Sequence, residues 1–392
     1  TFKVRVTSLS DGTVVDASDS NARIKGSIAL TSPVGAETWL VGSAHNITWT
    51  KVGSIPNVAL EYSIDGGTTY PNSITTTSGE ALSYGWTIPD AIGSQLRVRI
   101  RNTADATVYS ASGANFNIKG SFALTAPNGG EVYVVNSTND ITWTYVGSIP
   151  NVKLEYSIDG GATYPNTIIS STPTSTLLYS WTTPDTISNT CKVRISDALD
   201  SGVSDESSAN FKIKGSLTLT APNGGEGIPI NSSSNITWTR VGSFGNVKLE
   251  YSTDGGATYP NTIVASTPSL DLAYLWNPVP DTPSSQCKVK ITSVDDSTVY
   301  DASNNNFSIK GSLNLTAPTG GQTWIVGSTH AITWTKFGNI TTVKLEYSTD
   351  AGATYPNVIS NSEPAGALSY NWVIPDSIGT QLRVKITDTG DA

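Results

Sequence analysis

The four-residue stretch Ile118-Lys119-Gly120-Ser121 decides how this chain is interpreted, because it occurs four times. The other copies begin at Ile24, Ile213 and Ile309, so successive copies are 94, 95 and 96 residues apart. Each interval contains the same further segments in the same order: Leu-Thr-x-Pro, Ile-Thr-Trp-Thr, Leu-Glu-Tyr-Ser, Tyr-x-Trp before Pro-Asp, and Val-x-Ile. A period of this length exceeds the roughly 20 to 50 residues of solenoid repeats and has the size of a domain. The repeats are therefore predicted to be tandem domains, each with its own core.

Within a repeat the pattern is that of short strands. Val58, Leu60 and Tyr62 alternate with Ala59, Glu61 and Ser63, as in a strand with one wet face. An Asp-Gly-Gly turn follows at residues 65–67, where glycine supplies the positive φ that tight hairpins need. Pro-Asp pairs, such as the one at residues 89–90, are expected to end the strand that carries the second Trp. Several short strands in about 95 residues predict an all-β fold of tandem antiparallel β-sandwiches.

The run Ile-Thr-Trp-Thr, Val-Lys-Leu-Glu-Tyr-Ser and a Gly-rich hairpin resembles the early strands of fibronectin type III and related immunoglobulin-like modules. The stretch from Ala126 to Glu131 and on to Trp143 is similar to tandem repeats of very large bacterial surface and secreted proteins, and to a fungal cell-wall module. The resemblance covers nearly the whole chain and implies Ig-like or fibronectin III-like sandwiches. No repeat has a pair of cysteines, so it implies the fold and not an immune role.

The repeat spacing predicts domain boundaries as well. We expect Ig-like repeats at 26–119, 120–214, 215–310 and 311–392, with the closing strands of a preceding repeat at 1–25 and without closing strands in the last repeat. The chain contains no Met, which favours a fragment or processed piece of a longer protein. Two interpretations of the ends stay open: a window cut from a longer array, or a head-to-tail joint in which one chain completes the last domain of the next.

Composition narrows the classes of partner. Charged residues make up 14% of the chain, with 23 Lys and Arg against 32 Asp and Glu, a net charge of −9 and a pI near 4.7. Such a field repels phosphate backbones and anionic headgroups, so nucleic acid is a poor partner. No stretch approaches the roughly 18 apolar residues of a membrane helix. Expected partners are other copies of the chain, further repeats of a longer parent chain and, in an alternative interpretation, cell-surface glycan.

Few residues suggest chemistry. His45 and His330 are the only histidines, and we expect both in loops. Cys191 and Cys287 stand where other repeats have Leu, which predicts buried free thiols. No catalytic, cofactor or metal site is predicted. The glutamates that recur in Leu-Glu-Tyr-Ser are predicted to form a solvated stripe, too widely spaced for glycosidase chemistry, at Glu61, Glu155, Glu250 and Glu346. Acidic loops could hold Ca²⁺, but capping of turns is the expected role of Asp197, Asp200, Asp205, Glu206, Asp295, Asp296 and Asp301.

The aromatic residues are the strongest repeated signal. Two Trp recur in every repeat, and we expect them to pack on each other across the sandwich, although exposed Trp would suggest sugar binding; they are Trp49, Trp143, Trp238 and Trp334, then Trp86, Trp181, Trp276 and Trp372. Trp39 and Trp324 are replaced by Tyr133 and Ile228 in the other repeats, which again describes packing. The Lys of Ile-Lys-Gly is expected to face outward, in a salt bridge at the joint or in water, and not in an isopeptide crosslink.

The joints predict how the repeats work together. About two residues separate the last strand of one repeat from the first strand of the next, as at Gly120, so a flexible linker is excluded and a stiff, elongated rod is expected. Strands of about ten residues would advance it by roughly 35 Å per repeat. We therefore predict a non-enzymatic structural protein, an extracellular or cell-surface rod, stalk or filament. The alternative is a glycan- or surface-binding adhesin that uses loops of the Ig-like units.

Overall fold

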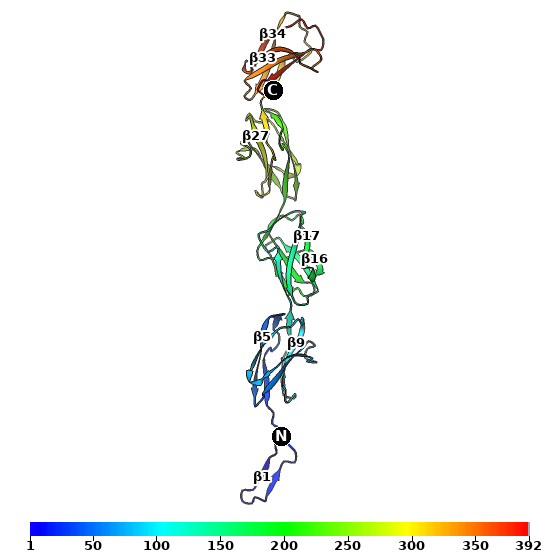
Figure 1. The fold of residues 1–392 in the computed structure, drawn as a ribbon, viewed down its shortest axis with the longest axis vertical. Coiled ribbons are helices and arrows are strands. Elements are labelled where there is room, and N and C mark those ends of the chain that lie inside the picture. Colours follow the sequence, from blue (N-terminus) through cyan, green and yellow to red (C-terminus); the bar gives the residue numbers. More distant parts are fainter. Residues whose placement is uncertain (391–392) are drawn as a thin grey trace. The chain divides into compact units, whose positions relative to one another are not determined.

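The computed structural model describes residues 1–390, and nearly all regular structure in it is β-strand. The chain divides into two compact units. The first comprises Thr1–Tyr133, Thr138–Thr182 and Ser188–Lys212, and the second comprises Val134–Ser137, Thr183–Ile187 and the chain from Ile213 onward. The first unit holds the N-terminal hairpin and most of the first two repeats; the second unit holds the last two (Figure 1).

The first repeat is a sandwich of two sheets (Figure 1). One sheet has the order β3-β5-β8, and the other has the order β4-β11-β9-β6-β7 with β10 paired to β9. All pairs are antiparallel except β4 with β11, which run parallel. The strands are β3 (Ser27–Ser32), β4 (Thr38–Leu40), β5 (Ala44–Val52), β6 (Asn57–Ser63), β7 (Asn72–Ser78), β8 (Ser83–Thr87), β9 (Gly93–Asn102), β10 (Tyr109–Ala111) and β11 (Phe116–Lys119).

The second and third repeats have the same strand order as the first. The second contains β12 (Ser121–Ala126), β13 (Val132–Val134), β14 (Thr138–Val146), β15 (Asn151–Ser157), β16 (Asn166–Pro173), β17 (Leu178–Thr182), β18 (Ser188–Asp197), β19 (Ser204–Glu206) and β20 (Phe211–Lys214). The third contains β21 (Ser216–Ala221), β22 (Gly227–Pro229), β23 (Ser234–Val241), β24 (Asn246–Ser252), β25 (Asn261–Pro268), β26 (Ala273–Trp276), β27 (Ser284–Ser293), β28 (Tyr300–Ala302) and β29 (Phe307–Lys310).

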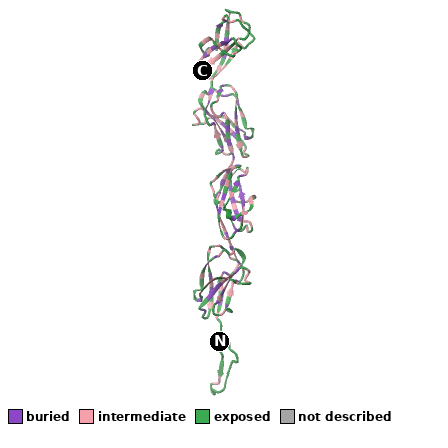
Figure 2. Cartoon of the chain, turned by 45° about the vertical axis from the view of Figure 1, so that its right-hand side comes forward, coloured by how far each residue is buried: buried purple, intermediate pink, exposed green. Residues whose placement is uncertain are grey.

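In the fourth repeat the described residues form two three-stranded sheets, β30-β31-β34 and β33-β32-β35. Its strands are β30 (Ser312–Ala317), β31 (Thr329–Phe337), β32 (Thr342–Ser348), β33 (Asn357–Pro364), β34 (Ser369–Val373) and β35 (Arg383–Asp388). One short 3-10 turn precedes the strand with the second Trp in each repeat: η1 (Gly79–Ala81), η2 (Thr174–Thr176), η3 (Ser269–Asp271) and η4 (Ala365–Ala367). At the other end, β1 (Arg5–Thr7) and β2 (Val15–Ala17) form an exposed hairpin (Figure 2). Within residues 1–390 there is no helix whose length and apolar character would let it span a bilayer.

Along the strands, every second residue is generally buried, and these buried residues form the cores inside the sandwiches (Figure 2). In β9, Leu96, Val98 and Ile100 are buried, whereas Arg97 and Arg99 between them are partly exposed. The strand β6 departs from the predicted alternation, because Ala59 and Ser63 are also buried. The buried Ser63 hydroxyl is satisfied by the turn that follows, since it donates to Asp65 Oδ1 at 2.6 Å.

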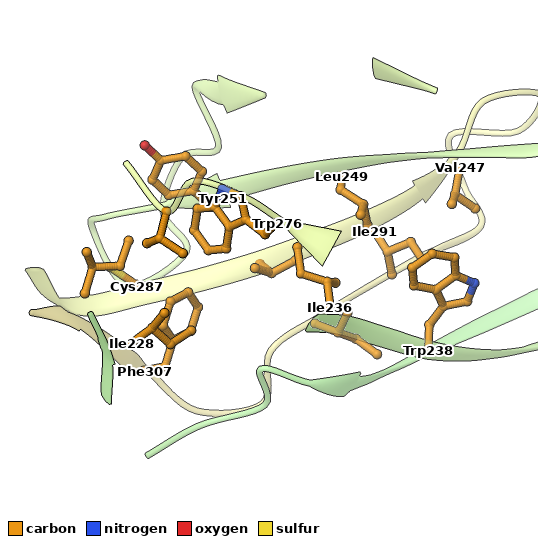
Figure 3. Packing of buried hydrophobic residues seen from close by; sticks show 14 of the residues in the cluster. Ile228, Ile236, Trp238, Val247, Leu249, Tyr251, Trp276, Cys287, Ile291 and Phe307 are labelled. Carbon is orange, nitrogen blue, oxygen red and sulfur yellow. The ribbon is translucent and has the colours of Figure 1, made fainter. Parts of the chain in front are cut away.

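The two repeated Trp are core residues, as predicted, but they do not stack on each other. In the third repeat, Trp238 lies toward one end of the core, and Trp276 lies toward the other with Tyr251 and Phe307 (Figure 3). The Trp276 ring is 5.1 Å from Tyr251 and 6.5 Å from Phe307 between centroids. Trp238 instead donates its Nε1–H to the Ser269 carbonyl oxygen at 3.0 Å. The two indole rings of a repeat thus pack in different halves of its core.

Candidate functional site: the joints between repeats

A single glycine separates consecutive repeats. The strand β11 ends at Lys119 and β12 begins at Ser121, so only Gly120 lies between them. The same holds at Gly215 and Gly311. This is shorter than the linker of about two residues that the sequence predicts.

These glycines are also packed too tightly to carry a side chain. A β-carbon on Gly120 would lie 2.7 Å from the Val146 carbonyl oxygen and 2.6 Å from Ile149 Cδ1. A β-carbon on Gly215 would meet the Val241 carbonyl oxygen at 2.7 Å and the Phe244 ring at 2.6 Å. Glycine is needed at these joints because backbone approaches backbone.

A carboxylate bridges each of two joints. In the first unit, Asp90 of the first repeat accepts hydrogen bonds from the Ser148 backbone N–H at 3.0 Å and from its hydroxyl at 2.5 Å. In the second unit, Asp185 holds Ser243 in the same way, at 2.8 and 2.6 Å. The Ser243 hydrogen bonds keep the pKa of Asp185 below its usual value, so the acceptor stays charged at neutral pH. These Asp residues belong to the Pro-Asp pairs that were predicted only to end a strand.

Apolar contacts accompany the carboxylate. Gly147, which precedes Ser148, lies so close to Ile92 and Val41 that an added β-carbon would be 3.0 and 3.1 Å from their methyl groups. Gly242 is placed similarly against Val135 and Ile187, at 3.2 and 3.4 Å. Both glycines have positive φ. Each of these joints therefore combines close packing with two hydrogen bonds from one serine to one aspartate.

The Lys of Ile-Lys-Gly faces outward at the joint, as predicted. Lys119 forms an ion pair with Asp200 of the following repeat, with 2.9 Å between Nζ and Oδ2. Lys214 donates to the Thr298 carbonyl oxygen at 3.0 Å. The ion pair lowers the pKa of Asp200. Exposed ion pairs contribute little stability, so we expect the Lys119 pair to add little to the stability of the joint.

The acidic residues expected to cap turns divide into two groups. Asp197, Asp200 and Asp296 cap turns as predicted, because they accept the backbone N–H of Leu199 at 2.9 Å, of Gly202 at 3.0 Å and of Thr298 at 3.0 Å. For Asp205 and Asp301 the prediction was wrong: they lie in strands β19 and β28 and accept the Leu124 N–H and the Leu219 N–H of other strands, each at 2.7 Å. Across residues 1–390, no cluster of three or more His, Cys, Asp or Glu could hold a metal ion.

Two predictions about polar residues were wrong. His45 and His330 lie in strands β5 and β31, not in loops. Each stacks on the extra Trp of its repeat, with 4.4 Å between the ring centroids of His45 and Trp39 and 4.5 Å for His330 and Trp324. The signal was present in the sequence, because only the repeats with this Trp have the His.

The predicted solvated stripe of glutamates is the second error. These side chains are mostly shielded, with Glu155 7% exposed, because cations of the same strand and of the neighbouring strand cover them. Glu155 is bound by Arg194 at 2.8 Å and by Lys153 at 2.5 Å. Burial raises its pKa, but the hydrogen bonds from both cations outweigh burial and the net shift is downward. Cys191 and Cys287, in contrast, are buried free thiols as predicted.

Each β6-type strand ends in a turn fastened by one aspartate. Asp65 accepts bonds from the Ser63 hydroxyl and from Thr69 N–H and Oγ1–H. The turn spans residues 64–71, longer than the tight hairpin predicted, while Gly66 and Gly67 have the expected positive φ. In the fourth repeat, Ala351 adopts the same conformation with φ of 62°. The aspartate, not glycine alone, therefore defines the turn.

The turn predicts a pH dependence. Hydrogen bonds from Ser63 and Thr69 lower the pKa of Asp65 from 3.8 to about 2, and equivalent bonds lower that of Asp159 to about 2. A carboxylate with a depressed folded-state pKa stabilises the fold above pH 3.8 and loses this contribution as pH falls toward 2. We expect the urea midpoint to hold steady from pH 7 to 5 and to decline between about pH 4 and 2. In the variant with Asn at both positions this decline should be shallower; an equal decline would contradict the assignment.

No protein-family model matches this chain, and no curated protein matches its sequence. Among solved structures, it is similar to fibronectin(III)-like modules of CbhA from Clostridium thermocellum, with 20% identity over 47% of this chain and 92% of that one and a TM-score of 0.17. It is also similar to the N-terminal four Ig domains of Dscam1 isoform 4.44, with 9% identity over 74% of each chain and a TM-score of 0.27. The Sidekick-1 immunoglobulin domains 1–5 match with 10% identity over 72% of this chain and 58% of that one, at a TM-score of 0.22. The chain is built of tandem Ig-like and fibronectin III-like repeats, which its own strand order establishes.

Proposed function

We propose that this protein is a structural array, an extracellular rod, stalk or filament whose work is mechanical and involves no catalysis. The single-glycine joint, closed by packing and by a carboxylate, is the observation that carries the proposal. Domains on loose tethers swing freely, whereas a joint of one residue with cross-joint contacts restricts the angle between neighbours. A chain of such joints keeps its two ends apart.

The strand order inside a repeat supports a load-bearing role. The short strand β4, which follows the first strand β3, is hydrogen-bonded in parallel to the last strand β11, with Thr38, Trp39 and Leu40 opposite Asn117, Ile118 and Lys119. The strands β22 and β29 of the third repeat pair in the same way. Tension on the two ends of such a repeat pulls parallel strands in opposite directions, so it shears the hydrogen bonds together and does not unzip them one at a time.

An insertion variant tests this proposal. We expect small-angle X-ray scattering of the 392-residue chain to be fitted by an ensemble with a narrow distribution of maximum dimensions. Inserting a Gly/Ser segment of about ten residues after Gly120 should broaden the distribution, because the joint then behaves as a flexible coil. An insertion of the same length in the turn after Asp350 is the control and should leave the breadth unchanged. Equal breadth for the native chain and the Gly120 insertion would overturn the proposal.

A further inference from the structure

We propose that the outer face of the β6/β9 sheet, and its counterpart in every repeat, binds acidic polysaccharide. The strand β9 places Arg97, Arg99 and Arg101 on this face, opposite the buried side of the strand. Each other repeat also has three cations there: Lys153, Lys192 and Arg194 in the second, Lys248, Lys288 and Lys290 in the third, and Lys344, Arg383 and Lys385 in the fourth. These patches hold twelve of the 23 Lys and Arg in a chain of net charge −9.

Every repeat has three cations on this face, but the strand that supplies the third cation differs between the first repeat and the others. In the first repeat Arg101 stands opposite Ala59. In the second repeat the cation is on the other strand, where Lys153 stands opposite Ser196. The third and fourth repeats follow the second, with Lys248 opposite Thr292 and Lys344 opposite Thr387. In either arrangement this third cation pairs with the recurring glutamate, Arg101 with Glu61 and Lys153 with Glu155, so the exchange preserves both the ion pair and the number of cations on the face.

The cations are held in place and partly exposed. Glu61 fixes two of them, because its carboxylate accepts bonds from Arg99 at 2.7 Å and from Arg101 at 3.0 Å. Their side chains remain 30% and 32% exposed. One glutamate against three cations leaves two positive charges in excess at this patch, whereas in the second repeat Glu206 also pairs with Lys192 at 3.2 Å and the excess is one. The arginines therefore have donors to offer to an anion from solution.

A tyrosine completes each patch. The Arg99 guanidinium lies 4.4 Å from the centroid of the Tyr70 ring, and Arg194 lies 4.3 Å from Tyr164. Lys290 and Lys385 lie 5.6 and 5.5 Å from Tyr259 and Tyr355. An aromatic ring beside fixed cations suits a sugar ring that carries an acidic group. Hydroxyl side chains border the glutamates on the adjacent strand, where Ser73 pairs with Glu61 and Thr167 pairs with Glu155.

The charge density selects the class of ligand. A patch with a small positive excess among hydroxyls complements a polymer whose carboxylates or sulfates are separated by neutral, hydroxyl-rich rings. A nucleic acid has a phosphate on every residue, so the acidic remainder of this chain repels it more strongly than it repels a polymer with fewer charges per length. This surface lies on strands, so it is distinct from the loops that the alternative glycan-binding adhesin would use.

Two charge-matched variants test the proposal on the 392-residue chain. The face variant is R97Q/K192Q/K288Q/R383Q, which removes one cation per repeat and spares the partners of Glu61. The joint variant is K25Q/K119Q/K214Q/K310Q, which removes the same charge away from the patches. Binding of hyaluronate, κ-carrageenan, neutral dextran and single-stranded DNA is measured by biolayer interferometry at two salt concentrations, with circular dichroism and urea midpoints confirming that both variants are folded.

We expect the native chain to bind both acidic polysaccharides, and not neutral dextran, with an affinity that falls as salt is added. The face variant should bind at least about tenfold more weakly, and the joint variant should stay within about threefold of the native chain. Absence of binding, equal losses in both variants, or tighter binding of DNA would each overturn the proposal. So would salt-sensitive self-association of the chain that the face variant abolishes without any polymer, because the patch would then serve a second copy.

Discussion

Replacing Trp238 by alanine is expected to unfold the third repeat at a urea concentration at which the other repeats stay folded. The side chain is only 2% exposed and its Nε1–H is satisfied by the Ser269 carbonyl oxygen. Trp238→Ala removes a large buried ring and leaves that carbonyl without its donor, a loss of about 3 to 5 kcal/mol. Domains have a total stability of only about 5 to 15 kcal/mol, so this repeat should lose much of it.

The measurement is urea unfolding followed by tryptophan fluorescence and by hydrogen exchange resolved to peptides. We expect an early transition confined to residues 215–310. Leu270→Ala is the control, because Leu270 neighbours Ser269 but is 70% exposed, and it should leave the transition in place. A Trp238→Ala chain that unfolds like the native one, or that unfolds everywhere at once, would contradict separate cores.

The second large effect is expected from adding one methyl group at a joint, which should lower the stability of the chain there. In Gly215→Ala, the new β-carbon would meet a backbone oxygen of Val241 at 2.7 Å, and backbone cannot rotate away as a side chain can. We expect a cost of about 1 to 3 kcal/mol, with the strain located at the joint. Hydrogen exchange should rise at β21 and in the loop that contains Ser243.

Gly366→Ala serves as the matched control for this substitution. Nothing lies within 4 Å of its β-carbon position, and its φ is not positive, so alanine should be tolerated there. If Gly215→Ala and Gly366→Ala have the same urea midpoint and hydrogen-exchange pattern, the close backbone approach at the joint does not affect stability, and the prediction is wrong.

The core could be predicted from sequence because its signal is periodic and repeated. Leu96, Val98 and Ile100 alternate with arginines, and Cys191 and Cys287 stand where Leu96 stands, so burial followed from pattern and size. The short joints could also be predicted, because the Ile-Lys-Gly-Ser motif recurs where one repeat meets the next. These features depend on neighbours along the chain or on equivalent positions in other repeats.

Contacts between distant residues were missed. Asp90 precedes Ser148 by 58 positions, and nothing in a Pro-Asp pair indicates that its carboxylate reaches the next repeat. Glu61 looked solvent-facing by alternation, which is correct for its direction, but alternation does not show that Arg99 and Arg101 cover it. The stacking of His45 on Trp39 was recoverable, because both residues are absent from the second and third repeats.

The exchange of a cation between facing strands limits how the repeats can be recombined. A chimera with β15 in place of β6 would set Lys153 opposite Arg101, two like charges at directly paired positions, beside a glutamate already occupied. A chimera with β6 in place of β15 would set Ala59 opposite Ser196, so this pair of positions would have no cation. Crossovers at the Ile-Lys-Gly boundary avoid both outcomes, so gene shuffling, natural or in the laboratory, should succeed with whole modules and fail with single strands.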